Sequence, residues 1–163
     1  MSEVRNQMLE LSVPQLREGR MVPVFTLPSV AGGVSGPGTL RSKYNMVLVF
    51  VGMGSDAWEY LRSVVRIYPD ISSEQARVIA VAVGDRQGVQ QLATELALPF
   101  AVLADSDGKL TRRMLGGEGG AALCVADRYG EVYFLQIAPN AASLPDPQTA
   151  VDWLQFIGIQ CPE

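Results

Sequence analysis

Two continuous apolar runs of strand length, with a helical pattern between them, constrain the fold of this chain most strongly. The runs are residues 46–51 (MVLVFV) and 77–83 (RVIAVAV). Uninterrupted apolar stretches of this length are typical of strands that are covered on both faces of a sheet. Between the runs, apolar residues recur at the spacing of one helical face. These residues are Trp58, Leu61, Val65 and Tyr68. The pattern predicts a β-α-β unit.

Further strands and helices are predicted after this unit. The expected helices cover residues 85–97, 109–115 and 146–157, and the expected strands cover residues 100–103, 122–126 and 131–137. The turn sequence DRYG between the last two strands predicts a hairpin. Asp146 followed by Pro147 is a favoured start for the last helix. The sheet is therefore expected to be mixed, parallel first and antiparallel afterwards.

The N-terminal third of the chain gives weaker patterns. We expect a short edge strand at residues 22–27, because Pro23 and Pro28 cannot donate to a strand ladder. Residues 31–38 are rich in glycine and proline and predict a loop. A short helix is expected over residues 4–11.

The length and charge of the chain limit the class of protein. A chain of 163 residues with 48% hydrophobic content is long enough for one domain with a core and short for two. The 13 basic residues are outnumbered by 17 acidic residues and are scattered, which does not favour nucleic-acid binding. No segment approaches the roughly 20 apolar residues of a membrane span, and the first residues carry charges where a signal peptide is apolar. We therefore expect a cytoplasmic protein that binds neither nucleic acid nor membranes.

Missing residue types exclude several kinds of site. The chain contains no histidine, the usual acid/base group at neutral pH and the commonest metal ligand. Its two cysteines, Cys124 and Cys161, form neither a CxxC pair nor a zinc-ligand spacing. Asp105 and Asp107 resemble the start of a calcium loop, but the acidic residues expected later in such a loop are missing, so we interpret them as turn formers. We expect no metal and no cofactor.

The segment GMGSDA, residues 52–57, formally fits the dinucleotide fingerprint G-x-G-x-x-A and lies between a strand and a helix. The acidic residue that would bind the ribose could only be Asp85, which comes too late in the chain. Asp56 places a negative charge where the pyrophosphate would lie. Asp56 and Glu59 have instead the spacing of a helix capping box. Nucleotide or small-molecule binding at the turn from Gly52 to Asp56 is therefore the weakest functional hypothesis.

Three segments of the chain carry a resemblance to a known family. They are GRMVPVFTL (residues 19–27), which fits the pattern G-x-x-x-P-x-F-x-L, LPFAVLADSDGKL (residues 98–110) and the hairpin segment ALCVADRYGEVYF. In this order they resemble the opening and two later parts of the peroxiredoxin family that includes alkyl hydroperoxide reductase and thiol-specific antioxidant proteins. The resemblance implies an α/β protein with a thioredoxin-like fold, in which helices flank a central mixed β-sheet. It also divides the chain into an N-terminal extension, residues 1–18, and a single thioredoxin/peroxiredoxin-like domain, residues 19–163.

The resemblance implies a reactive site whose cysteine is missing here. The family places its peroxidatic cysteine, or a CxxC pair, in the first turn of the helix after the 46–51 strand, where the helix N-terminus lowers the thiol pKa. Depending on a one-residue choice of alignment, these positions hold Ser55 and Trp58, or Asp56 and Glu59. The position that often carries a proline or threonine-type residue beside the thiol is Ala121. No candidate for the family's catalytic arginine lies in the region of Glu118 and its neighbouring glycines.

Three hypotheses about function follow. The leading one is a domain without thiol peroxidase chemistry that serves as a binding or assembly module, as a homodimer or with a protein partner. The rival is an antioxidant thiol oxidoreductase of the peroxidase type that uses a relocated Cys161 or Cys124. Cys124 is expected in the core, as free cysteines usually are, and Cys161 near an exposed C-terminus. The third is the small-molecule or nucleotide binder at the turn from Gly52 to Asp56.

Overall fold

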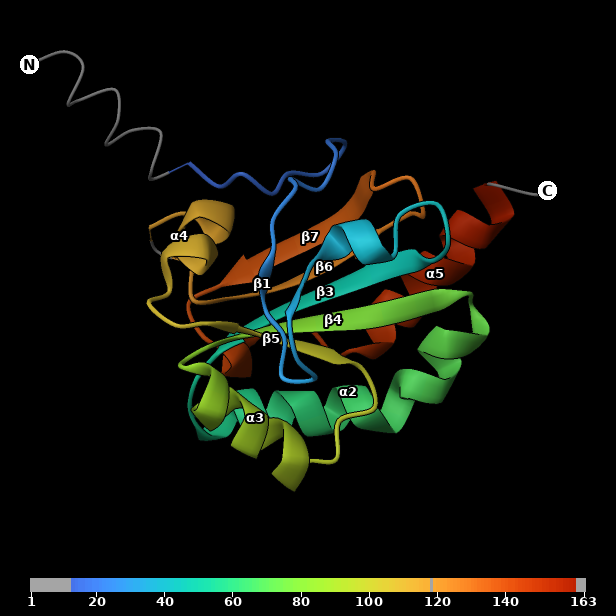
Figure 1. Ribbon diagram of the computed structural model, residues 1–163. Helices are drawn as coiled ribbons and strands as arrows, with labels where there is room; N and C mark the ends of the chain where they lie inside the picture. Colours follow the sequence, from blue (N-terminus) through green and yellow to red (C-terminus); the bar gives the residue numbers. More distant parts are fainter. Residues whose placement is uncertain (1–12, 118, 161–163) are drawn as a thin grey trace, which may run out of the picture.

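The computed structural model describes residues 13–117 and 119–160, which fold around a five-stranded sheet in the order β5-β4-β3-β6-β7 (Figure 1). The strands of this sheet are β3 (Asn45–Gly52), β4 (Ala76–Val83), β5 (Ala101–Asp105), β6 (Ala121–Ala126) and β7 (Val132–Ala138). The α-helices are α2 (Ser55–Ser73), α3 (Arg86–Glu95), α4 (Lys109–Leu115) and α5 (Gln148–Gln160). Two-residue strands β1 (Leu27–Pro28) and β2 (Val34–Ser35) pair with each other, and short 3-10 helices η1 (Pro37–Thr39) and η2 (Ala141–Ser143) complete the fold.

The sheet is mixed, as the sequence predicts. β3 runs parallel to β4, and β4 runs parallel to β5. β6 is antiparallel to both β3 and β7. The helix α2 connects β3 to β4, which confirms the β-α-β unit, and the β6–β7 hairpin turns at the DRYG sequence.

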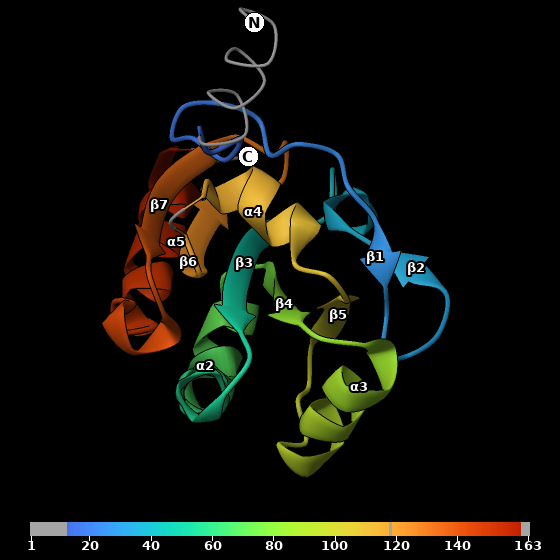
Figure 2. The ribbon, with the colours of Figure 1, turned by 90° about the vertical axis from the view of Figure 1, so that its left-hand side faces the viewer.

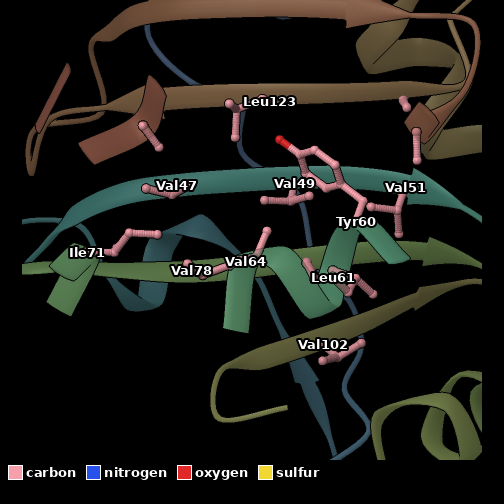
Figure 3. Close-up of a cluster of buried hydrophobic side chains, with 14 of the residues drawn as sticks. Val47, Val49, Val51, Tyr60, Leu61, Val64, Ile71, Val78, Val102 and Leu123 are labelled. Atoms are coloured by element: carbon pink, nitrogen blue, oxygen red, sulfur yellow. The ribbon is translucent and has the colours of Figure 1, made fainter. Parts of the chain in front are cut away.

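Both faces of the sheet are buried, and β3 shows why its sequence is continuously apolar. Successive side chains of a strand point to opposite faces. Val47, Val49 and Val51 pack with α2, α3 and α5 on one face, and Figure 3 shows these valines beside Leu61 and Val64 of α2. The alternate residues of β3, which are Met46, Leu48 and Phe50, lie in a second core on the other face. Figure 2 shows α4 and the N-terminal segment on that second face.

The segment before β1 covers part of the second core. Leu16 is buried within it, and the backbone N–H of Leu16 donates to the carbonyl of Met114 at 3.1 Å. The carboxylate of Glu18 accepts a hydrogen bond from the backbone N–H of Leu135, in the edge strand β7, at 3.1 Å. Part of the predicted extension, residues 13–18, thus lies against the sheet. The short helix expected over residues 4–11 falls outside the described residues.

The edge strand predicted at residues 22–27 is wrong. Met21 forms only an isolated bridge to Glu131, and pairing resumes at Leu27, which lies opposite Ser35. Pro23 interrupts the ladder because it has no backbone N–H to donate. The segment expected to be a loop, residues 31–38, contains the partner strand β2 and most of η1.

The start of α2 also differs from the prediction. The helix begins at Ser55 with Gly54 as its N-cap, and no side chain caps it, so the capping box of Asp56 and Glu59 is not formed. The buried face is also rotated relative to the predicted one. Its members are Ala57, Tyr60, Leu61, Val64 and Ile71, whereas Trp58, Val65 and Tyr68 are only half-buried. The small Ala57 allows the helix to approach the sheet, which leaves the bulkier Trp58 at the margin.

Candidate functional site

The carboxyl ends of the three parallel strands β3, β4 and β5 meet at one edge of the sheet, the place where α/β proteins usually bind ligands. β3 leaves this edge through two glycines with positive φ, Gly52 (φ 70°) and Gly54 (φ 127°). Side chains other than glycine are strained in this backbone region. The two glycines therefore set the direction in which α2 begins.

A hollow of about 340 Å³ lies over this turn. It is bordered by Gly52, Met53 and Asp56 of the turn, by Arg112 of α4, and by the loop that precedes β6. Gly120 in that loop leaves no room for a side chain, because a Cβ atom there would collide with the carbonyl oxygen of Pro139. Gly52, Gly108 and Gly119 also border the hollow, so backbone forms part of its wall.

Of the residues that the resemblance placed at the cysteine positions, only Asp56 borders the hollow. Ser55 and Glu59 are exposed on the first turn of α2. Trp58 is half-buried, and its indole Nε1 is buried without a hydrogen-bond partner among the described residues. Ala121 is fully buried at the first position of β6, so the hollow is bordered by the preceding Gly119 and Gly120 instead.

The first turn of α2 begins beside this hollow without a side-chain cap. The N–H groups of Ser55 and Asp56 donate to no acceptor among the described residues, and Gly54 supplies no side-chain cap. The carboxylate of Asp56 accepts a hydrogen bond from the neighbouring N–H of Ala57 at 3.0 Å. The positive end of the helix dipole thus faces one acidic side chain. This arrangement can hold a polar group, but it contains no thiol or imidazole for covalent or acid/base chemistry.

The sequence analysis missed Arg112, which supplies the cationic group of the hollow. A Cβ atom on Gly108 would lie 3.2 Å from the guanidinium Nη1, so this group lies directly over that glycine. Its neighbour Thr111 has no free donor for the hollow, because its N–H and its hydroxyl both donate to the carboxylate of Asp105 at 2.8 Å. The signal that could have found Arg112 is topological: the helix after a third parallel strand begins at the same edge of the sheet as α2.

Cys124 lies in the middle of β6 on the face opposite α2. It pairs with Leu48 of β3 and Leu135 of β7 and belongs to the second core. Burial, with a smaller contribution from the charge of Glu18, raises the pKa of its thiol to about 12. The thiol is therefore protonated at neutral pH and shielded from solvent. Cys161, the other candidate redox thiol, lies outside the described residues.

The acidic residues considered for nucleotide or calcium binding have structural partners. Asp85 caps α3, with its carboxylate accepting from the N–H of Gly88 at 2.7 Å. Asp105, the last residue of β5, is buried and accepts from the hydroxyl of Thr111, and Asp107 lies in the following turn and accepts from the N–H of Lys109 at 3.0 Å, so both stabilise the turn between β5 and α4. Within residues 13–117 and 119–160, no group of three or more acidic, cysteine or histidine side chains is placed to hold a metal ion.

No helix in the described part of the chain is long and apolar enough to cross a membrane.

No family model and no curated protein matches this chain. Solved structures do match it. A peroxidoxin, BcpB, from Mycobacterium tuberculosis superposes with a TM-score of 0.74 at 16% identity, covering 88% of this chain and 99% of that one. A thiol peroxidase from Chromobacterium violaceum gives 0.71 at 18% identity, covering 86% and 87%. A peroxiredoxin-like protein from Aquifex aeolicus gives 0.72 at 16% identity, covering 90% of each chain. The protein therefore has a thioredoxin-like fold, similar to the folds of these peroxiredoxin-like structures.

Proposed function

We propose that this protein is a non-catalytic binding or assembly module built on a peroxiredoxin-like frame. The proposal rests on two observations: the first turn of α2 has no cysteine, and the thiol of Cys124 lies elsewhere in the fold. The first turn of α2 carries Ser55, Asp56, Trp58 and Glu59, with no thiol among them. Cys124 faces the other side of the sheet, within a fully buried strand. A reactive thiol needs an exposed, electropositive setting, and Cys124 has neither.

The rival function is a thiol oxidoreductase, as the names of the similar peroxidoxin and thiol peroxidase suggest. It now depends on Cys161, because the burial of Cys124 opposes attack on peroxide. The test is oxidation of the reduced protein by hydrogen peroxide, followed by stopped-flow fluorescence and mass spectrometry. The variants Cys161→Ser and Cys124→Ala assign any product to one sulfur. We expect oxidation no faster than that of an ordinary free thiol. A fast, saturable reaction that Cys161→Ser abolishes would establish the rival.

A second candidate function, small-molecule binding at the turn from Gly52 to Asp56, is favoured by the hollow beside that turn. Arg112 offers it a cationic group, and Arg113, which is also exposed on α4, provides a matched control outside the hollow. The experiment records melting temperatures with inorganic phosphate, AMP and NAD as probes. A stabilisation that Arg112→Gln removes and Arg113→Gln retains would support binding here. Flat melting curves for all three probes would exclude it for these ligands.

The homodimer and the cytoplasmic location stay predictions. Two exposed apolar residues of α5, Phe156 and Ile159, support self-association. Sedimentation equilibrium over micromolar to submillimolar concentrations tests it, with Ile159→Glu as the variant. This side chain is 74% exposed, so a charge there does not disturb the core. A monomer at every concentration would remove the homodimer.

A further inference from the structure

A second cavity lies at the opposite end of the sheet from the hollow beside α2. Its volume is about 300 Å³, and it is bordered where β3 begins, where α2 ends, and where the β6–β7 hairpin turns (Figure 1). Four ionisable side chains border it, namely Lys43, Glu74, Asp127 and Arg128, together with Ile157 of α5. None of the hypotheses drawn from the sequence involves this end of the molecule.

Asn45 fixes the three segments that surround this cavity. Its backbone N–H donates to the carbonyl of Gln75 at 2.9 Å, and its side-chain amide donates to the carbonyl of Glu74 at 3.3 Å. Its amide oxygen accepts from the N–H of Arg128 at 3.0 Å. Because one side chain ties the end of α2 to the hairpin turn, the cavity is largely preformed.

Asp127 is the buried charge of this cavity. Only 5% of the residue is exposed, although it borders the cavity. Its Oδ1 accepts hydrogen bonds from the N–H groups of Tyr129 and Glu131, both at 2.9 Å. Its Oδ2 accepts none from the described residues. Only Arg41 Nε and Trp58 Nε1 are buried without a partner among the described residues, so Oδ2 of Asp127 is open to the cavity and can accept a hydrogen bond from a cationic group there.

The four ionisable side chains do not neutralise one another. Among the described residues, none of Lys43, Glu74, Asp127 and Arg128 forms an ion pair. The guanidinium of Arg128 lies instead over the ring of Tyr129, 5.1 Å from its centroid. The cavity therefore offers two cations and two carboxylates at once. The negative end of the α2 dipole adds to the attraction for a positive group.

We propose that this cavity binds a free amino acid. Its ammonium group lies toward Asp127 and Glu74 at the C-terminal end of α2, and its carboxylate lies toward Lys43 and Arg128. A zwitterion satisfies both pairs of charges without leaving a net charge in the cavity, whereas a simple anion or cation satisfies only one pair. Ile157 provides an apolar wall for the α-carbon and the beginning of a side chain.

The proposal is tested by NMR on the isotopically labelled full chain, with glycine, L-leucine, L-glutamate and L-lysine as probes. We expect at least one of them to shift the amide signals of Asn45, Gln75 and Arg128 in a saturable way below about 10 mM. The signals of Gly52 and Gly54, at the other end of the sheet, should not move. The same titration with the amide of the bound amino acid, and with the acid that lacks its amino group, should give at least tenfold weaker binding.

Two charge variants separate the proposal from a general effect of charge. Asp127→Asn keeps the oxygen that accepts from Tyr129 and Glu131 but loses the charge, and Lys43→Met changes an exposed side chain. Each should weaken binding about tenfold or more. Asp70→Asn, on an exposed position of α2 outside the cavity, should not. No saturable shift with any of the four amino acids, or equal binding of the one-charge analogues, would overturn the proposal.

Discussion

The helix α2 joins the two ends of the sheet, yet the residues that border the hollow at one end differ in kind from those that border the cavity at the other. At the N-terminal end of α2, four glycines are among the residues that border the hollow, and Arg112 and Asp56 are its charged side chains. At the C-terminal end, ionisable side chains crowd the cavity around Asn45. The end that the family resemblance marks is therefore shaped in part by the backbone, and the end it does not mark carries the denser set of polar side chains.

This contrast distinguishes the geometry that the fold provides from the chemistry that individual side chains provide. The thioredoxin fold brings a helix N-terminus to the carboxyl ends of parallel strands whatever residues are present. Chemistry at that point depends on a few side chains, because function resides in a site rather than in the fold. Here the first turn of α2 keeps the geometry and lacks the thiol.

The largest expected effect tests how far the hollow depends on backbone. Gly120→Ala should lower the free energy of unfolding by about 3 kcal/mol, because the new methyl group collides with the carbonyl oxygen of Pro139. Gly117→Ala in the same loop is the control, since a Cβ there meets no atom within 4 Å. Urea unfolding of both variants measures the difference. Equal stabilities would show that the loop before β6 adapts and that the hollow is not rigid.

The next effect concerns Cys124, which lies between the two ends. In the unfolded chain its thiol ionises above about pH 8.5, whereas in the native protein burial holds the pKa at about 12. The native state therefore keeps a proton that the unfolded state loses, and stability falls as pH rises, by about 1 kcal/mol per pH unit. Tyr60, whose pKa burial also raises, contributes in the same direction only above about pH 10.

Urea titrations between pH 8 and 10, in a Cys161→Ser background, measure the slope that Cys124 causes. Cys124→Ala should remove that slope while the stability at pH 7 changes separately through packing. A slope that persists in Cys124→Ala would show that another group titrates, and would weaken the case that this thiol is inert.

The sequence predicts most of the fold because the central strands β3, β4 and β6 are buried on both faces. The runs at residues 46–51 and 77–83 correspond to β3 and β4, and residues 109–115 are predicted as the helix α4 with its bounds. Two of the failures have local causes. Pro23 has no backbone N–H and prevents a strand in the N-terminal segment, and the N-cap of α2 is Gly54 rather than Asp56.

The candidate site is less predictable than the fold. Four positions, Ser55, Asp56, Trp58 and Glu59, follow from the resemblance, but only Asp56 borders the hollow. Arg112 comes from a distant helix, and its role requires knowing that β5 lies in the same parallel sheet. The cavity around Asn45 depends on contacts between residues 45, 74 and 128, which local sequence patterns do not reveal.

A pair of engineered thiols sharpens the comparison of the two helix ends. Ser55 and Ser73 are exposed, occupy the first and last positions of α2, and are each followed by an acidic residue. In a Cys161→Ser background, the thiol of Ser55→Cys should have a pKa about one unit below that of Ser73→Cys, because the helix dipole favours a thiolate only at its N-terminus. Alkylation rates as a function of pH give both values. Equal pKa values would mean that Asp56 cancels the field of the helix.

The smallest effect concerns backbone strain beside the cavity around Asn45. Gln75 has φ 55° directly after the C-cap of α2, and Ala97 has φ 49° directly after the C-cap of α3. Glycine is favoured at such positions, so Gln75→Gly and Ala97→Gly should each stabilise the protein by about 0.5–1 kcal/mol in urea unfolding. Gln75 borders the cavity and Ala97 does not. If the Gln75 side chain contacts the bound amino acid, Gln75→Gly will bind it more weakly despite the added stability, and Ala97→Gly will bind it unchanged. Stabilisation without loss of binding would assign Gln75 a role in ending the helix only.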